Sequence, residues 1–225
     1  MSPSFTRAAV LCGLMFAISP VLIALAPYVE EELRAGPGMG LVQKIFYFHL
    51  PSAWMFLLSG IVCGVASARY LANGVSRHDR VAQAAAELVV LFGAITLVTG
   101  PLWGWKRWGV PWVWDVRLTS SLVSWMVAVA YILLRRYGGA GSDKLAAGLA
   151  LFGLANVPFI YVSVNIWNSQ HPKTTVVPSL SVSFGVPLWF TVATFLVLFT
   201  LLLRLRVHLE EQRARVDSLY LSLDE

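Results

Sequence analysis

Five tryptophans and three basic residues stand close together in the middle of the chain. The tryptophans occupy positions Trp103, Trp105, Trp108, Trp112 and Trp114. An aromatic belt at a membrane surface accounts for one or two tryptophans per helix end, and explains five in one short loop poorly. Helix-breaking residues recur at Pro101, Gly104, Gly109 and Pro111. They predict that no long regular helix runs through residues 100–119, which we expect to form a rigid aromatic surface.

Such a surface suits a large flat ligand that carries acidic groups. Indole faces pack against an extended π-system by dispersion and offset stacking. Lys106, Arg107 and Arg117 could pair with carboxylates. Heme has this anatomy, because its apolar macrocycle carries two propionates. Lipid phosphates, or a structural pair between Arg117 and Asp115, are the alternative partners for these cations. For Asp115 itself we expect a structural role, either as a helix cap or in orienting Arg117, and Thr119 is a second candidate cap.

The histidines are candidate iron ligands. The chain has four, at His49, His78, His171 and His208. His78 and His208 stand in strongly charged surroundings, so we expect them to be solvated surface residues. His49 and His171 flank the tryptophan segment in sequence. A heme iron can take one neutral imidazole on each face, but a single histidine of this kind is more often a structural hydrogen-bonding group than a ligand.

The composition indicates which elements must position these residues. Hydrophobic residues make up 57% of the 225 residues and charged residues only 13%, which is too apolar for an ordinary soluble domain. About 20 apolar residues cross a bilayer as a helix. Six runs of this kind predict an all-α polytopic membrane protein, a bundle of six transmembrane helices over Ala8–Val29, Pro51–Leu71, Val81–Pro101, Leu118–Tyr137, Leu145–Asn165 and Val186–Leu205. We expect one heme-handling domain over residues 1–206 and a polar tail, a short helix, over 207–225.

The distribution of basic residues predicts the orientation. With both termini cytoplasmic, eleven of the 17 Lys and Arg residues lie on the cytoplasmic side. The tryptophan loop, His49 and His171 then all lie on the outer side of the membrane. Membrane orientation and contacts with anionic lipid account for the inner basic residues, so no nucleic acid is needed as a partner.

The two cysteines, Cys12 and Cys63, do not form a reactive motif. They fall inside the first and second apolar runs, and no Cys-x-x-Cys or Cys-x-x-Cys-His sequence occurs. The chain therefore lacks a dithiol redox motif and a covalent c-type heme site of its own. We expect both cysteines to be small buried residues.

The tryptophan segment resembles a known signature. The stretch Trp108-Gly-Val-Pro-Trp112-Val-Trp114-Asp115 looks like the Trp-Gly-x-x-Trp-x-Trp-Asp pattern, called WWD, of heme-handling membrane proteins. That superfamily includes the C and F proteins of multi-component cytochrome c maturation and the synthase of an alternative system. Length and six spans make the chain similar to the C-protein family over essentially its whole length, because the F-type proteins and synthases are longer.

This resemblance implies a function, ligands and partners. His49 and His171 would be the axial ligands of a b-type heme held non-covalently and transiently, cradled by the tryptophan loop at the periplasmic face of a bacterial inner membrane. The family's role is to present heme to a periplasmic heme chaperone. Its other partners are an ABC-type ATPase subunit, a second six-span subunit and a small one-span subunit. The chain has no phosphate-binding Gly-x-x-x-x-Gly-Lys-Ser/Thr loop, so ATP hydrolysis would belong to a partner.

Two other classes of function stay open. The first is an enzyme, a cytochrome c heme lyase that forms the thioether bonds itself, although those relatives carry additional spans and extra histidines. The second is a permease for heme or another small molecule. A translocation path favours ionisable residues inside the membrane, and only Glu87 comes close to such a position.

Overall fold

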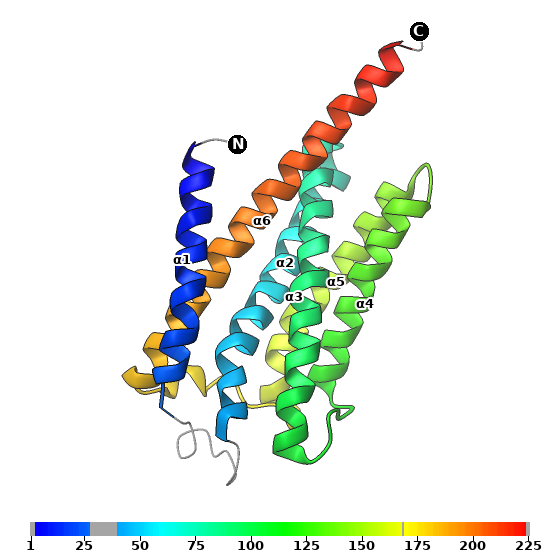
Figure 1. Cartoon of the computed structure of the whole chain (residues 1–225). Coiled ribbons are helices and arrows are strands. Elements are labelled where there is room, and N and C mark those ends of the chain that lie inside the picture. The colour runs from blue at the N-terminus through cyan, green and yellow to red at the C-terminus, as the bar shows by residue number, and fades with distance from the viewer. Residues whose placement is uncertain (1–2, 28–39, 168, 224–225) are drawn as a thin grey trace.

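The chain folds as a bundle of long helices (Figure 1). The computed structural model describes residues 3–27, 40–167 and 169–223. No strand occurs within these ranges. The elements are α1 (Pro3–Leu25), the 3-10 helix η1 (Gly40–Ile45), α2 (Phe46–Asn73), α3 (Ser76–Trp108), α4 (Val116–Tyr137), α5 (Ser142–Ile166), the 3-10 helix η2 (Val177–Ser179) and α6 (Val182–Leu223).

Each of the six α-helices is long and apolar enough to cross a membrane. This confirms the predicted fold class and the predicted number of membrane-spanning helices. The helices extend beyond most of the predicted apolar runs, since polar residues add turns at their ends. The last residues of the first run, Tyr28 and Val29, lie outside the described ranges. The predicted polar tail is helical, but it continues α6 without a break to Leu223.

The expectation that no regular helix runs through residues 100–119 is wrong for the first half of that segment. α3 passes Pro101 and continues to Trp108. It ends at Gly109, which adopts a left-handed conformation with φ 78° and donates its N–H to the Trp105 carbonyl. A packed membrane helix tolerates an internal proline because neighbouring groups satisfy the freed backbone carbonyl. Residues 100–108 therefore form the last turns of α3, and only the following residues form a loop.

The helices pack closely through small residues around α2. α2 contacts α3, α5 and α6; α4 lies against α3 and α5, and α1 lies on α6 (Figure 1). A Cβ atom at Gly64 would lie 2.4 Å from the Leu154 side chain, so only glycine allows α2 and α5 to approach this closely. Aromatic side chains, among them Phe56, Phe92 and Phe195, fill the core between α2, α3 and α6.

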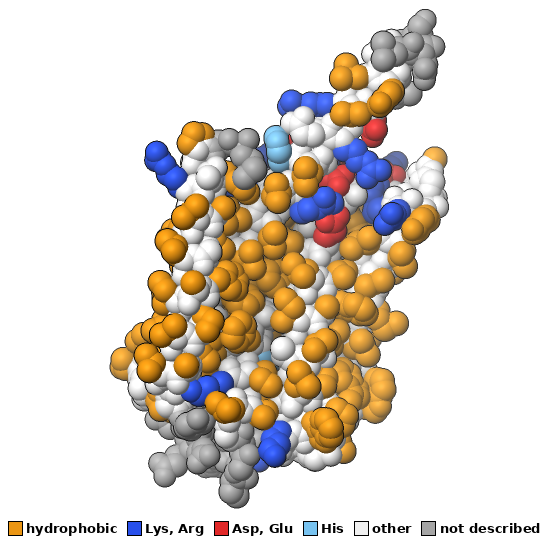
Figure 2. All heavy atoms as spheres, in the orientation of Figure 1, with side chains coloured by type: hydrophobic (Ala, Val, Ile, Leu, Met, Phe, Trp, Pro, Cys, Tyr) orange, Lys and Arg blue, Asp and Glu red, His pale blue; other side chains and the backbone are white. Residues whose placement is uncertain are grey.

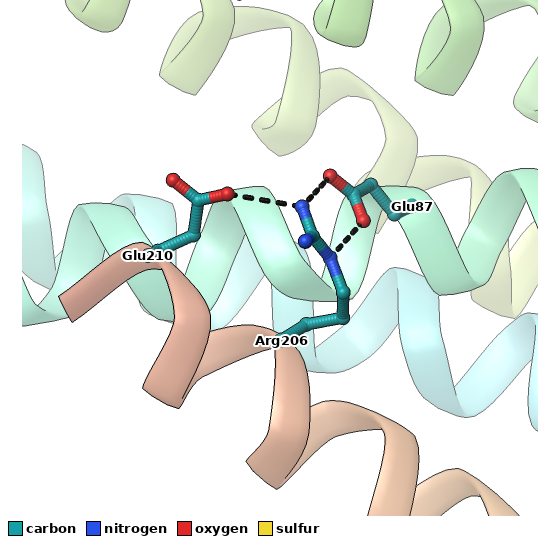
Figure 3. Close-up of polar contacts among 3 residues, drawn as sticks. All are labelled: Glu87, Arg206 and Glu210. Atoms are coloured by element: carbon teal, nitrogen blue, oxygen red, sulfur yellow. Dashed lines mark hydrogen bonds and ion pairs between the residues drawn. The ribbon is translucent and has the colours of Figure 1, made fainter. Parts of the chain in front are cut away.

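Charged pairs gather at the end of the bundle where both described termini lie (Figures 1 and 2). Arg206 of α6 binds the Glu87 carboxylate of α3 through two nitrogens, and its Nη2 also lies 2.9 Å from Glu210 (Figure 3). Arg135 of α4 pairs with Asp79 of α3 at 2.6 Å. Glu87 is therefore part of an ion-pair network that joins α3 to α6.

Candidate functional site

The two histidines singled out by the sequence meet at the end of the bundle opposite these charged pairs. His49 lies in the first turn of α2, and His171 lies in the segment between α5 and η2. Their ring centroids are 6.5 Å apart, with the ring planes at 39°. The last turns of α3 and the start of α4, which carry the tryptophan segment, lie at the same end (Figure 1). The fold thus brings together two imidazoles separated by more than 120 residues.

His49 is held by a hydrogen bond that fixes its protonated nitrogen. Its Nδ1 lies 2.9 Å from Thr99 Oγ1, and that hydroxyl donates its proton to the Ile95 carbonyl at 2.7 Å. Thr99 can therefore only accept from His49, so His49 Nδ1 carries the proton and Nε2 presents a lone pair. Gly100 leaves room for this ring, because a Cβ there would lie 3.3 Å from His49 Cε1.

His171 is fixed in the same tautomer by a different partner. Its Nδ1 lies 2.9 Å from the Pro172 carbonyl, which can only accept a hydrogen bond, so Nε2 again holds a free lone pair. Burial of the ring and the nearby charge of Arg117 lower the pKa of His171 to about 3. The imidazole is consequently neutral, the form that binds metal ions.

The separation of the two rings suits one metal ion between them. A first-row metal binds an imidazole nitrogen at about 2 Å, and the ring centroid lies about 1 Å beyond that nitrogen, so two rings on opposite sides of one metal have centroids about 6 Å apart. The observed distance is 6.5 Å. Hydrogen bonds from both Nδ1–H groups to oxygen atoms are the usual arrangement around metal-binding histidines.

Asp115 connects the tryptophan segment to the loop that carries His171. It caps α4, with Oδ1 accepting a hydrogen bond from the Leu118 N–H at 2.8 Å, which confirms the predicted structural role. Oδ2 accepts from Ser169 Oγ at 2.6 Å and from the Gln170 N–H at 3.1 Å. Ser169 Oγ in turn accepts from the His171 N–H at 3.1 Å. One carboxylate therefore both starts α4 and positions the His171 backbone. Thr119 is not the cap, because it lies within α4.

A cavity of about 920 Å³ opens beside the two histidines. This volume lies in the upper part of the range of ligand-binding sites. Seven of the eleven residues predicted for the site line it, namely His49, His171, Trp103, Trp108, Trp112, Arg107 and Arg117. The other four, Trp105, Lys106, Trp114 and Asp115, do not line it. Trp105 and Trp114 are 63% and 75% exposed and point away from the packed interior.

The lining tryptophans are held at right angles rather than in a flat stack. Trp103 and Trp108 meet edge to face, with centroids 5.5 Å apart. Gly104 makes this possible, since a Cβ there would lie 2.7 Å from the Trp108 ring. Trp103 Nε1 donates to the buried Gln43 Oε1 at 2.9 Å, which ties α3 to η1. Trp112 Nε1 is buried and has no hydrogen-bond partner among the described residues.

The cavity is also lined by a cation that makes no direct ion pair with an acidic group of the described residues, although the charge of Asp115 acts on it from farther away. Arg117 is partly buried in the first turn of α4, and within the described part of the chain no acidic group forms an ion pair with it. The expected alternative, a structural pair with Asp115, is therefore not formed. An unpaired, partly desolvated guanidinium and an orphan indole N–H are costly alone and favour an anionic acceptor in the cavity.

Comparison with known proteins assigns the chain to a family. A sequence model described as heme exporter protein C matches residues 4–221. The chain belongs to the heme exporter protein C family. It is 35% identical to the heme exporter protein C of Bradyrhizobium diazoefficiens, over 90% of this chain and 80% of that protein. Identity to the protein of the same name from Escherichia coli is 34%, over 79% and 76% of the two chains.

Three positioning residues of this heme exporter protein C family member were missed by sequence reasoning. Thr99, Gln43 and Ser169 hold His49, Trp103 and Asp115 in place. Each is a common polar residue, and all three act on partners 50 or more residues away in the chain. The sequence offers one local signal for Ser169: it stands two positions before His171 in the loop that follows α5, where a serine side chain can bond to a nearby backbone N–H.

Proposed function

We propose that this chain binds heme at the outer face of the membrane, between His49 and His171, and passes it to a partner protein during c-type cytochrome biogenesis. The observation that carries the proposal is the pair of imidazole rings, 6.5 Å apart at the rim of a 920 Å³ cavity, each with its Nδ1 bonded to oxygen. Membership of the heme exporter protein C family supports the same ligand.

The remaining lining residues each have a task in this proposal. Trp103, Trp108 and Trp112 provide apolar ring surface for the macrocycle. Arg117 and Arg107, which line the same cavity, pair with the propionates, and Trp112 Nε1–H donates to the same anionic edge. Trp105, Trp114 and Lys106 lie outside the cavity wall. Their predicted role in heme contact stays a prediction, and we propose contact with an arriving protein as a second role for them.

We place the site on the periplasmic side of a bacterial inner membrane, with both termini in the cytoplasm. The predominance of basic residues at the end that carries the termini supports this orientation. Accessibility of a single cysteine introduced at exposed Trp114 to a membrane-impermeant maleimide in intact spheroplasts tests it, and labelling only after lysis would reverse the orientation.

The proposed recipient is a periplasmic heme chaperone, and the chain works with an ABC-type ATPase subunit, a second six-span subunit and a small one-span subunit. The heme is a b-type group that the chain holds non-covalently and transiently. The protein's contribution is to ligate, orient and shield it, while ATP hydrolysis takes place in a partner subunit.

The test is absorption spectroscopy of the purified chain and two histidine variants. Heme added to the wild-type protein should give the low-spin spectrum of a bis-imidazole complex, whereas His49→Ala and His171→Ala should each give a high-spin or weakly bound species. Imidazole added in solution should restore the low-spin spectrum, because it fills the vacated position. The control is His78→Ala, at the opposite end of the bundle. An unchanged low-spin spectrum in either site variant would remove that histidine from the ligand set.

The two alternative functions, a permease and a heme lyase, are less well supported. A permease path through the bundle is not favoured by Glu87, since Arg206 neutralises this carboxylate at the charged end. A lyase would have to bind an apocytochrome and protonate heme vinyl groups. Thioether formation by the purified chain with reduced heme and an apocytochrome peptide would establish that alternative.

A further inference from the structure

The cavity extends from the histidines into the part of the bundle that lies within the membrane. His49 is in the first turn of α2, yet Phe56 and Leu57 of the same helix also line the cavity. Seven residues of helix correspond to about 10 Å along its axis. Ile160 of α5 and Thr96 of α3 line this deeper part as well. The space beside the histidines therefore reaches about two helical turns below the rim.

On one side, the wall of this cavity is formed by two helices that do not pack extensively against each other. α5 and α6 both contribute lining residues, but they are not among the helix pairs with extensive contact. Tyr161 of α5 and Trp189 of α6 line the cavity and are nevertheless 48% and 54% exposed. Side chains of both helices thus line the cavity and remain accessible, as an opening between α5 and α6 requires.

Trp189 belongs to the outward face of α6. It shares that face, at helical spacing, with Val182, Val186 and Leu196, which are 80%, 57% and 45% exposed. Its ring packs against Trp54 of α2, with centroids 5.5 Å apart and planes at 46°. This pair lines the cavity on the α6 side, and Tyr161 lines it on the α5 side.

The charged lining residues of the cavity lie at the histidine end, and the deeper lining residues are uncharged. Its three basic lining residues, Arg107, Arg117 and Lys173, all come from helix ends or the connecting loop. The lining residues between α5 and α6 carry no charge, namely Tyr161, Trp54, Trp189 and Leu57. A flat ligand with an apolar body and acidic groups at one edge can lie across such an opening with the acidic edge towards the basic end.

We propose that the cavity has a lateral portal between α5 and α6, bordered by Tyr161 and by the Trp54–Trp189 pair, through which heme enters from the adjacent lipid leaflet. This inference rests on the proposed function. Heme dissolved in a bilayer keeps its propionates near the headgroups and its macrocycle among the acyl chains. It can then slide between the helices towards the histidines without exposing the macrocycle to water, and its propionates arrive beside Arg117.

The test blocks the portal from outside and measures how fast heme loads. Val186 is one helical turn from Trp189, on the outward face, and does not line the cavity. A Val186→Cys variant, in a Cys12→Ala/Cys63→Ala background shown to bind heme, is labelled with fluorescein maleimide and reconstituted in liposomes. Growth of the bis-imidazole absorption is followed after heme addition. The matched control is labelled Val98→Cys, 60% exposed on α3 and also outside the cavity wall.

The labelled Val186→Cys protein should load at least tenfold more slowly than the labelled control and reach the same final spectrum. Trp189→Ala, which removes one side of the portal without any label, should load faster than the wild type. Equal rates for the two labelled proteins, or no acceleration in Trp189→Ala, would overturn the portal while leaving the heme site intact. Absence of the low-spin spectrum in the unlabelled protein would instead overturn the proposed function, and the portal with it.

Discussion

At the scale of single residues, the site depends on hydrogen bonds that set the tautomer and orientation of two imidazoles before any ligand binds. Both present Nε2, because Thr99 Oγ1 and the Pro172 carbonyl accept the hydrogen bonds from the two Nδ1–H groups. A ligand atom that is already oriented loses less freedom on binding metal. The two partners differ, since one is a side chain that can be substituted and the other is a backbone carbonyl that cannot.

Thr99→Val tests whether the hydrogen bond to His49 Nδ1–H matters for heme binding. Valine keeps the branched shape and removes the acceptor that the described residues provide for His49 Nδ1–H, so the Kd for heme should rise by about 10- to 100-fold. Thr191→Val is the matched control, because the Thr191 hydroxyl donates to the Pro187 carbonyl of its own helix at 2.7 Å and the residue does not line the cavity. Heme titration followed by absorption measures both. Equal affinities for the two variants would contradict a positioning role for Thr99.

The protonation of His171 gives a second prediction at this scale. Burial and Arg117 lower its pKa to about 3, below the ordinary value of about 6.5. The neutral ring is therefore favoured by the fold, and its contribution to stability is complete above pH 6.5 and falls as the pH drops from 6.5 towards 3. In heme-free protein with ¹⁵N-labelled histidine, the His171 resonance, assigned with His171→Gln, should stay that of a neutral ring at pH 5. A midpoint near 6.5 would contradict this.

At the scale of elements, the start of α4 organises the loop of the second histidine. Asp115 caps α4 and also accepts hydrogen bonds from Ser169 and Gln170, just before His171. The far end of the same loop is closed by Asn165 and Thr174, whose side chains bond to each other at 2.9 Å. The aspartate of the tryptophan signature thus positions the loop that carries His171, and it does not line the cavity.

Asp115→Ala should separate these two tasks when compared with Ser169→Ala. Loss of the cap costs about 1 kcal/mol of stability, and loss of the loop contacts should raise the Kd for heme by more than tenfold. Ser169→Ala leaves the cap intact, so its thermal midpoint should stay near that of the wild type while heme binding still weakens. Heme titration and thermal unfolding in detergent are the measurements. Normal heme affinity in both variants would show that the loop does not depend on Asp115.

At the scale of the whole molecule, the ligand site and the ion-pair network occupy opposite ends of one bundle. Arg206 joins α6 to α3 through Glu87, and α6 also carries α1 (Figures 1 and 3). The pair is partly exposed, with 31% of each side chain accessible. We therefore assign it a modest stabilising role in holding α6 against the bundle.

Arg206→Ala should lower stability without reaching the heme site directly. A partly exposed pair contributes about 1 kcal/mol, which corresponds to about 2–4 °C in Tm for a chain of this size. Arg204→Ala, an exposed residue of the same helix, should leave Tm unchanged. Heme affinity should be within about twofold of wild type in both variants, because Arg206 and the two histidines lie at opposite ends of the bundle. A large loss of heme binding in Arg206→Ala alone would indicate coupling between the two ends.

The membrane-spanning helices and one helix cap could be predicted from local features of the sequence. The six membrane-spanning helices follow from apolar runs, and the cap at Asp115 follows from a short acidic residue just before such a run. The end of α3 was misjudged because Pro101 and Gly104 break helices in water but are accommodated in a packed membrane bundle. The continuous α6 was also missed, since a change to polar composition marks the membrane edge and not the end of a helix.

The sequence by itself determined the chemistry available to this protein: two histidines, a cluster of indoles and a few cations at one end of six apolar helices. Only the tertiary structure decided which of these groups share one cavity, because contacts such as those of His49 with His171 and with Thr99 join distant helices and loops. It also decided that Trp103, Trp108 and Trp112 line the cavity while Trp105 and Trp114 do not. The direction of a side chain on a helix depends on what that helix packs against, and spacing within one segment does not contain that information.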